Sequence, residues 1–301
     1  MTVRCLRSIL ENSGDVAYEV IIADDGSSDL TGSIGERVEN IRHARTEQNS
    51  HFIRNCNNAA TQARGEFLLF LNNDTVVCPG WLQPLLDIAG ADDKVGIVGS
   101  RLVYPDGRLQ EAGGIMWRDG SAWNYGRMDD PTRPAYSYVK EVDFVSGASL
   151  MIRADLWRQL GGFDEHYCPA YYEDADIAFQ AREAGYKVIY QPLSQVIHFE
   201  GVSHGTDLDS GIKQYQRDNQ QKFREKWQAE LDRFHFANAD HVFQARDRSR
   251  DQRTVLYIDH YVPHYDKDAG SRSTFMYVQL MLEMGYRVLF MGANFFPHKP
   301  Y

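Results

Sequence analysis

Residues 66–74 read Glu-Phe-Leu-Leu-Phe-Leu-Asn-Asn-Asp, an apolar run that ends in three polar residues. Such a run predicts a buried strand. Residues 19–29, Glu-Val-Ile-Ile-Ala-Asp-Asp-Gly-Ser-Ser-Asp, repeat this pattern, and His198 follows the apolar pair at 196–197 in the same way. In open α/β sheets ligands bind outside the carboxyl ends of the strands, so the three polar clusters predict one shared crevice. Taken singly, each of these carboxylate clusters is explained equally well by side chains that stabilise a turn.

Helices and strands are expected to alternate along the rest of the chain, which predicts an α/β fold. The predicted helices cover residues 3–10, 57–63, 81–88, 155–160, 174–184, 214–231 and 273–284. Further strands are expected at 95–98, at 142–152, as two short pieces within 187–197, and at 255–258 and 286–291. Residues 104–138 are rich in Gly, Pro, Asp and aromatic residues and predict irregular structure or short antiparallel strands.

Composition excludes several classes of protein. The 301 residues carry a net charge of -10, which argues against a protein that coats nucleic acid or an anionic membrane. The four cysteines form no CxxC pair and no zinc spacing, so we expect reduced thiols and a cytoplasmic location. No apolar stretch approaches the roughly 18 residues of a membrane span.

The chain is expected to contain two unequal domains. Residues 246–253 alternate basic and acidic side chains and predict a solvated linker. We therefore expect a first domain at 1–240, a charged linker at 241–253, and a partial βαβ unit at 254–301. Because the chain opens in an amphipathic helix, we also expect one strand to precede it.

A fourth polar cluster, Tyr171-Tyr172-Glu173-Asp174-Ala175-Asp176, opens a predicted helix. Acidic residues are common at helix N-termini, where they cap the backbone, so capping is the alternative reading. The helix dipole would lower the pKa of Asp174, whereas Glu173 and burial would raise it. The sequence leaves the balance open.

Taken together, these motifs resemble the family 2 glycosyltransferases of the GT-A fold. The resemblance rests on residues 24–29 and 63–74, on Gly161-Gly162-Phe163-Asp164-Glu165, on residues 172–174, and on His198-x-x-Gly201-x-Ser203. It covers about residues 1 to 235 and is nearest to bacterial surface-polysaccharide transferases, including rhamnosyltransferases. It implies a Rossmann-like mixed sheet with helices on both faces.

The resemblance also implies roles for individual residues. Asp24 and Asp25 would lie by the nucleotide base and ribose, with Asn72, Asn73 and Arg64 near the donor diphosphate. Asp74 would bind a divalent metal, Mg²⁺ or Mn²⁺, with His198 as a second ligand. Asp174 would be the general base that deprotonates the acceptor, with Glu173 beside it.

The expected function is an inverting transfer from a UDP- or dTDP-sugar to a glycan or lipid-linked acceptor, with peripheral membrane association through that acceptor and no nucleic-acid partner. Two positions depart from the family pattern: Asn72 replaces the first Asp of the metal motif, and His51 stands where the family usually has Gly. The alternatives are a glycoside hydrolase, which needs two carboxylates but no nucleotide pocket, and a non-catalytic or inactive sugar-nucleotide-binding module. Residues 259–272 resemble the start of a GT-B glycosyltransferase.

Overall fold

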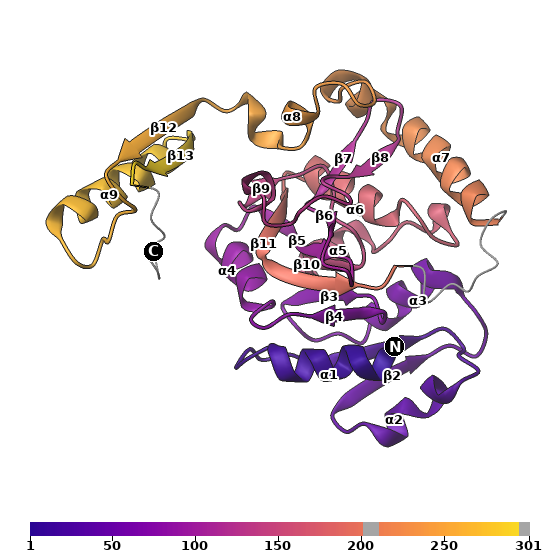
Figure 1. Ribbon diagram of the computed structural model, residues 1–301. Helices are drawn as coiled ribbons and strands as arrows, with labels where there is room; N and C mark the ends of the chain where they lie inside the picture. The colour runs from indigo at the N-terminus through magenta and orange to yellow at the C-terminus, as the bar shows by residue number, and fades with distance from the viewer. Residues whose placement is uncertain (201–210, 295–301) are drawn as a thin grey trace. The chain divides into compact units, whose positions relative to one another are not determined.

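The computed structural model describes residues 1–200 and 211–294, and the chain divides into two compact units at Arg248/Ser249 (Figure 1). Gly201 and Ser203, which belong to the resemblance, lie outside the described residues. The first unit contains the helices α1 Thr2–Asn12, α2 Ile34–Arg37, α3 His51–Ala60, α4 Gln83–Ala91, α5 Ala154–Leu160, α6 Glu173–Glu183, α7 Gly211–Phe234 and α8 Val242–Ala245. Its strands are β1 Val20–Asp24, β2 Ile41–Arg45, β3 Phe67–Leu71, β4 Thr75–Val77, β5 Val95–Val103, β6 Leu109–Glu111, β7 Gly114–Met116, β8 Ala122–Asn124, β9 Lys140–Glu141, β10 Ser149–Arg153 and β11 Lys187–His198.

A mixed seven-stranded sheet forms the centre of this unit. Its main order is β3-β10-β5-β11-β4, with β6 added beside β5 and β9 beside β11. Strands β5 and β11 are parallel, and β10 runs antiparallel to both β3 and β5. The strands β3, β5 and β11 therefore share one direction, and their carboxyl ends lie at one edge. Asn72 and His198 are both at this edge, as the sequence predicts.

Helices cover both faces of the sheet, because alternate side chains of each strand point to opposite faces. Leu150 and Ile152 of β10 pack in one core with residues of α3, α5, α6 and α7. Met151, between them, packs in the other core with residues of α1 and α4. The architecture is the GT-A type of α/β fold that the sequence predicts.

The strand that carries Asp24 lies outside the central sheet. β1 pairs in parallel with β2, a strand that the sequence analysis missed, and these two strands form a sheet of their own. Asp24 therefore ends a strand of another sheet. The following helix α3 begins earlier than predicted, at His51, whose φ of +67° lies in the left-handed region. Glycine adopts this conformation without steric cost, which is consistent with the glycine that the family resemblance leads one to expect here.

Two predicted strand regions differ from the structure. β11 is one strand with a register shift between Gln191 and Gln195, where Pro192 removes a backbone donor, rather than two short strands. The single strand predicted at 142–152 is interrupted by a turn, in which the Ser149 N–H donates to the Ser146 carbonyl at 3.2 Å. The strand β10 begins only after this turn.

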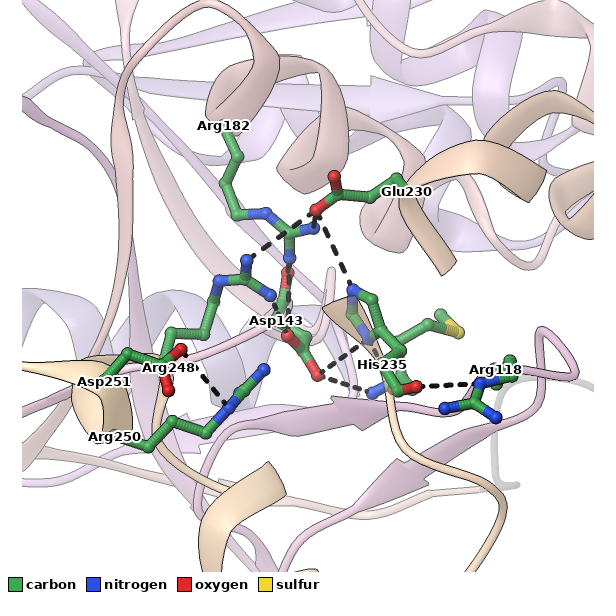
Figure 2. Close-up of polar contacts among 9 residues, drawn as sticks. Arg118, Asp143, Arg182, Glu230, His235, Arg248, Arg250 and Asp251 are labelled. Atoms are coloured by element: carbon green, nitrogen blue, oxygen red, sulfur yellow. Dashed lines mark hydrogen bonds and ion pairs between the residues drawn. The ribbon is translucent and has the colours of Figure 1, made fainter. Parts of the chain in front are cut away.

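A buried group of charges fixes the end of the first unit (Figure 2). The Asp143 carboxylate lies 2.6 Å from Arg248 and 3.5 Å from Arg182, and the same two arginines face Glu230. Burial alone would raise the pKa of Asp143, but the charges of His235, Arg248 and Arg182 hold it below its ordinary value. The stretch 246–253, predicted to be a solvated linker, thus begins inside the first unit.

The second unit begins at Ser249 and contains a βαβ arrangement, as predicted. β12 Thr254–Asp259 pairs in parallel with β13 Arg287–Gly292, and α9 Ala269–Glu283 connects them. α9 begins four residues before the predicted helix because Asp268 caps it, accepting the Ser271 N–H at 2.7 Å. Neither the domain boundaries predicted at 240 and 253 nor the likeness to a GT-B start is tested by this geometry.

The Asp143 group predicts a large stability effect. Asp143→Asn leaves Arg182 and Arg248 buried beside one another with the less buried Glu230 as their remaining shared carboxylate, so we expect the free energy of unfolding to fall by about 3–5 kcal/mol. All five tryptophans lie in residues 1–248, so tryptophan fluorescence during urea unfolding of the full chain reports on this unit.

Asp106→Asn is the matched control for this prediction. Asp106 pairs with Arg108 at 2.5 Å, but the two side chains are 48% and 52% exposed. Removing such a solvent-exposed pair should leave the stability nearly unchanged. Equal losses in the two variants would contradict the assignment of the Asp143 group as a buried anchor.

Candidate active site

The first group of candidate residues lies where β3 ends and β11 ends. His198 pairs in register with Thr75 of β4, which brings its ring to the Asn72–Asp74 turn. Its Nε2 lies 3.3 Å from Asp74 Oδ1 and 3.5 Å from Asn72 Nδ2. Asp74 is buried. The structure thus brings His198 next to Asn72 and Asp74, which precede it in the sequence by 126 and 124 positions.

Gln110, on β6, fixes the orientation of the His198 ring. The Gln110 amide donates from Nε2 to the Glu200 carboxylate at 3.0 Å, so its Oε1 faces His198 Nδ1, also at 3.0 Å. A carboxylate only accepts hydrogen bonds, which sets the direction of the amide. Nδ1 therefore carries the proton and donates to Gln110. Nε2 is left as an acceptor that faces the Asp74 carboxylate.

This arrangement fits a divalent cation. Two acceptors, Asp74 Oδ1 and His198 Nε2, face one another, and a second bond from the far ring nitrogen is the usual support of a metal-binding histidine. Within residues 1–200 and 211–294, no three His, Cys, Asp or Glu side chains converge in a metal-binding group. A cation held by Asp74 and His198 would need further ligands beyond these two.

The second group is built around Asp174 at the start of α6. Its Oδ2 accepts the Gly147 N–H at 3.0 Å, and its Oδ1 accepts the N–H of Ala175 at 2.8 Å. Burial raises the pKa of Asp174 in spite of these two hydrogen bonds. Burial, and then the neighbouring Asp174, also raise the pKa of Glu173. Desolvation therefore outweighs the helix N-terminus, which settles the balance that the sequence leaves open.

The loop before α6 is held in an unusual conformation. Tyr171 and Tyr172 both have positive φ, +78° and +73°, although neither is glycine. Asn219 of α7 supports the loop, because its Nδ2 lies within hydrogen-bond distance of the carbonyls of Tyr167, Ala170 and Tyr171, at 2.8–3.0 Å. Strained backbone of this kind persists where the surroundings fix it, commonly at functional sites.

The third acid of the cluster has a different role. Asp176 is fully buried and accepts hydrogen bonds from Trp227 Nε1 at 2.7 Å and from the Tyr167 hydroxyl at 3.1 Å. It also pairs with Lys226 at 2.8 Å. Asp176 therefore anchors α7 against α6, whereas Glu173 and Asp174 face the turn and loop of the site.

A single turn connects the two groups. The Asn72 N–H donates to the Ala148 carbonyl at 3.1 Å, and the preceding residue, Gly147, donates its N–H to Asp174. The end of β3 and the start of α6 are thus bound to neighbouring residues of one turn. The two sets of polar residues form one site at the carboxyl edge of the sheet.

Asp24 and Asp25 are bound by residues of the turn after β1, of β2 and of the segment before α3. Asp24 accepts the Ser27 N–H at 2.8 Å and pairs with His43 and Arg45 of β2 at 2.9 and 2.8 Å. Burial alone would raise the pKa of Asp24, but these partners lower it. Asp25 accepts the N–H and the hydroxyl of Ser50 at 2.6 and 2.7 Å. Both carboxylates thus shape the turn after β1 and its contact with α3.

Two further candidates point elsewhere. Asn73 is exposed, and its amide donates to the Thr2 hydroxyl of α1 at 3.1 Å. Arg64 is exposed before the amino end of β3, while Asn72 follows the carboxyl end. The five residues of β3 between them span about 17 Å. The expectation that Arg64 reaches the donor diphosphate is therefore corrected, because the strand itself separates the two positions.

Sequence reasoning missed four residues that position the site: Gln110, Glu111, Ser146 and Gly147. Glu111 is buried, and its Oε1 accepts the Ser146 N–H at 3.0 Å. The only local signal is a polar pair, Gln110-Glu111, between apolar residues. None of the four belongs to a motif of recognisable spacing, so their contacts appear only in the folded chain.

Comparison with known proteins agrees with this geometry. Residues 1–160, which are more than half of the chain, match the model of glycosyl transferase family 2. The chain belongs to this family.

Two relatives of this glycosyltransferase are bacterial enzymes of polysaccharide or glycolipid synthesis by name. It is 33% identical over 157 residues to the O-antigen biosynthesis protein RfbC of Myxococcus xanthus, covering 50% of this chain and 12% of that protein. It is 27% identical over 223 residues to the N-acetylglucosaminyl-diphospho-decaprenol L-rhamnosyltransferase of Mycobacterium tuberculosis, covering 64% and 70%. The chain thus spans about an eighth of the length of the first of these relatives.

A solved structure shares the fold of this glycosyltransferase. The crystal structure of GalNAc-T7 with UDP, GalNAc and Mn²⁺ superposes with a TM-score of 0.62 at 17% identity, covering 77% of this chain and 47% of that one. Among residues 1–200 and 211–294, no helix has the length and apolar character to cross a membrane.

The Gln110 contact predicts the tautomer of His198. In the wild type at mildly alkaline pH the neutral ring carries its proton on Nδ1, and Gln110→Leu, which removes the acceptor, allows the Nε2–H form to appear. Long-range ¹H–¹⁵N spectra of the histidine rings distinguish the two tautomers, and His198→Gln identifies the signal. An Nε2–H ring in the wild type would rule out the assigned hydrogen-bond direction.

Proposed function

We propose that this family 2 glycosyltransferase catalyses an inverting, metal-assisted sugar transfer from a nucleotide-diphosphate donor, with Asp174 as the general base. The observation that carries the proposal is the Gly147–Ala148 pair, which binds Asp174 on one side and the Asn72 backbone on the other. A base and a cation-binding pair are thereby set at one sheet edge. An inverting displacement needs these two elements, a base for the acceptor and stabilisation of the leaving group.

Asp74 and His198 are the residues that would hold the cation. Mn²⁺ or Mg²⁺, when bound with a nucleoside diphosphate, would neutralise the negative charge that grows on the leaving group. Asn72, in place of a first aspartate, contributes no charge to this pair. A histidine in the ligand set tilts the preference toward Mn²⁺.

Asp174 would take the proton from the acceptor hydroxyl. Its raised pKa strengthens it as a base, and its two backbone hydrogen bonds fix the carboxylate in one orientation. The neighbouring Glu173, whose pKa is also raised, would remain protonated beside it. General base catalysis of this kind typically contributes about 10²–10⁴ in rate.

The donor and acceptor classes follow from the relatives. A UDP- or dTDP-sugar is the proposed donor, and a glycan or lipid-linked glycan in surface-polysaccharide synthesis is the proposed acceptor, as the names of the O-antigen and rhamnosyltransferase relatives indicate. Asp25 and the turn after β1 remain proposed as the neighbourhood of the nucleotide base and ribose. The proposed location is the cytoplasm, at the membrane where a lipid-linked acceptor is found.

Asp74 provides the test of the donor site. Asp74→Asn removes the carboxylate of the proposed cation pair, so the Mn²⁺-dependent gain in affinity for UDP or dTDP should fall by about tenfold or more. Isothermal titration with and without Mn²⁺ measures it, and Asp106→Asn serves as the control. Equal Mn²⁺-dependent binding by Asp74→Asn and wild type, or a wild type that binds neither nucleotide, would contradict the proposal.

Asp174 provides the test of the chemistry. After a donor and acceptor screen on the full-length protein, Asp174→Asn should lower transfer by about 10²–10⁴, while donor affinity stays within about threefold. The wild-type rate should decline on the acid side with a midpoint above the ordinary aspartate pKa. Released nucleoside diphosphate measures the rate.

Glu165→Gln, at an exposed acid that pairs with Arg54, is the matched control and should keep its rate. The base assignment fails if Asp174→Asn loses donor binding together with activity. A fully active Asp174→Asn would favour a different base, and a wild type that binds donor without transfer would favour the binding-module alternative.

A further inference from the structure

Glu111 is a buried acid that the proposed chemistry does not use. Only 1% of the residue is exposed, and it lies on β6, which pairs with the central strand β5. Its Oε1 accepts the Ser146 N–H at 3.0 Å, whereas its Oε2 has no hydrogen-bond partner among residues 1–200 and 211–294. A buried oxygen without a partner is costly, so an acid retained at this place needs a reason.

The turn that Glu111 binds is the turn that binds Asp174. The Ser146 N–H donates to Glu111, and the next N–H, of Gly147, donates to Asp174. Glu111 of β6 and Asp174 of α6 thus accept hydrogen bonds from two consecutive backbone amides. Displacing the Ser146 amide would also displace the Gly147 amide, because the two successive rigid peptide planes share the Ser146 Cα.

The strand β6 serves both halves of the site. Gln110 binds His198, and Glu111 binds the turn at Asp174. Consecutive side chains of a strand point to opposite faces, so one short strand sets both groups without a further loop. Both residues are buried, at 2% and 1% exposure, which leaves them little freedom to move.

We infer that Glu111 is a positioning residue for Asp174, acting through the Ser146–Gly147 backbone. It fixes the amide that orients the carboxylate of the proposed base. The catalytic meaning of this role rests on the proposed function. The hydrogen bonds that connect Glu111 to Asp174 through the turn do not depend on that function.

The charge of Glu111 is consistent with this role. Burial and the nearby Asp174 raise the pKa of Glu111 to about 8, against the opposing effect of the Ser146 amide. The acid is therefore neutral at pH 7 and adds no negative charge beside Asp174. The titratable groups around it are Asp174, with Glu173 next to it, and Tyr190, whose hydroxyl donates to the Tyr136 carbonyl at 2.9 Å.

The Gly147 amide gives a direct test that needs no substrate. In full-length protein labelled with ¹⁵N-glycine, the Gly147 signal should shift with pH as Asp174 ionises and should not do so in Asp174→Asn. Gly147→Ala identifies the signal, because a Cβ there meets Asp174 at an ordinary 3.7 Å. Glu111→Ala should raise the exchange rate of this amide about tenfold, as expected for loss of one supporting hydrogen bond, and should move its titration.

Three further variants complete the test. Glu111→Gln keeps a neutral acceptor for Ser146 and should leave the Gly147 amide protected. Glu111→Asp, whose side chain is shorter by one methylene, should raise the exchange rate of the Gly147 amide several-fold. If Glu111→Ala does not fold, the Glu111→Asp variant tests the inference in its place. Gln191→Ala removes a buried polar side chain of β11, bound to the Pro84 carbonyl, and is the control for general loss of stability. Unchanged Gly147 exchange in folded Glu111→Ala or Glu111→Asp would overturn the inference.

Kinetics separate positioning of the base from structural support elsewhere. In an active enzyme Glu111→Ala should lower kcat at least tenfold with donor KM nearly unchanged, while Glu111→Gln keeps most of kcat at pH 7. Loss of donor binding in step with kcat would overturn the role. If the wild type transfers no sugar, the proposed function fails, while the Gly147 amide still decides whether Glu111 positions Asp174.

Discussion

The hydrogen bonds of the turn at residues 146–148 are the constraint on which the rest of the site depends. Three consecutive residues of this turn each give a backbone group to a different element, because Ser146 binds Glu111, Gly147 binds Asp174 and Ala148 binds the Asn72 amide. Backbone polar groups that are buried must find partners. The side chains of Glu111 and Asp174, which accept two of these bonds, are therefore held in fixed positions by the turn.

The acids near this turn differ because their partners differ. Asp176 accepts bonds from Trp227 and Tyr167 and pairs with Lys226, so its role is structural. Asp174 has two amide donors, which favour its charged form, whereas Glu111 has one, and burial dominates its ionisation. Similar acidic side chains in one small region thus have different roles because different groups donate hydrogen bonds to them. Residue type alone does not predict these roles.

The sequence was a good guide to the parts of the fold that depend on local pattern. The apolar run 67–71 with its polar end, the alternation of helices and strands, and the convergence of Asn72, Asp74 and His198 follow from periodicity and from the rule for sheet edges. The separate β1–β2 sheet, the turn within 142–152 and the contacts of Glu111 were not predictable, because they depend on pairing between distant segments. The sequence motif placed Arg64 near the donor diphosphate because a motif alone does not show at which end of a strand a residue lies.

The proposed site, like the chain as a whole, is rich in acidic side chains. An anionic donor would approach a region that contains Asp74, Glu111, Glu173 and Asp174, where full ionisation would repel it. Burial holds Glu111 and Glu173 toward their neutral forms, and the Asp74–His198 pair offers oxygen and nitrogen ligands to a cation. The proposed site would therefore reduce its negative charge by desolvation of these acids and by a cation bound at Asp74 and His198, and a nucleoside diphosphate could be held there without a basic surface.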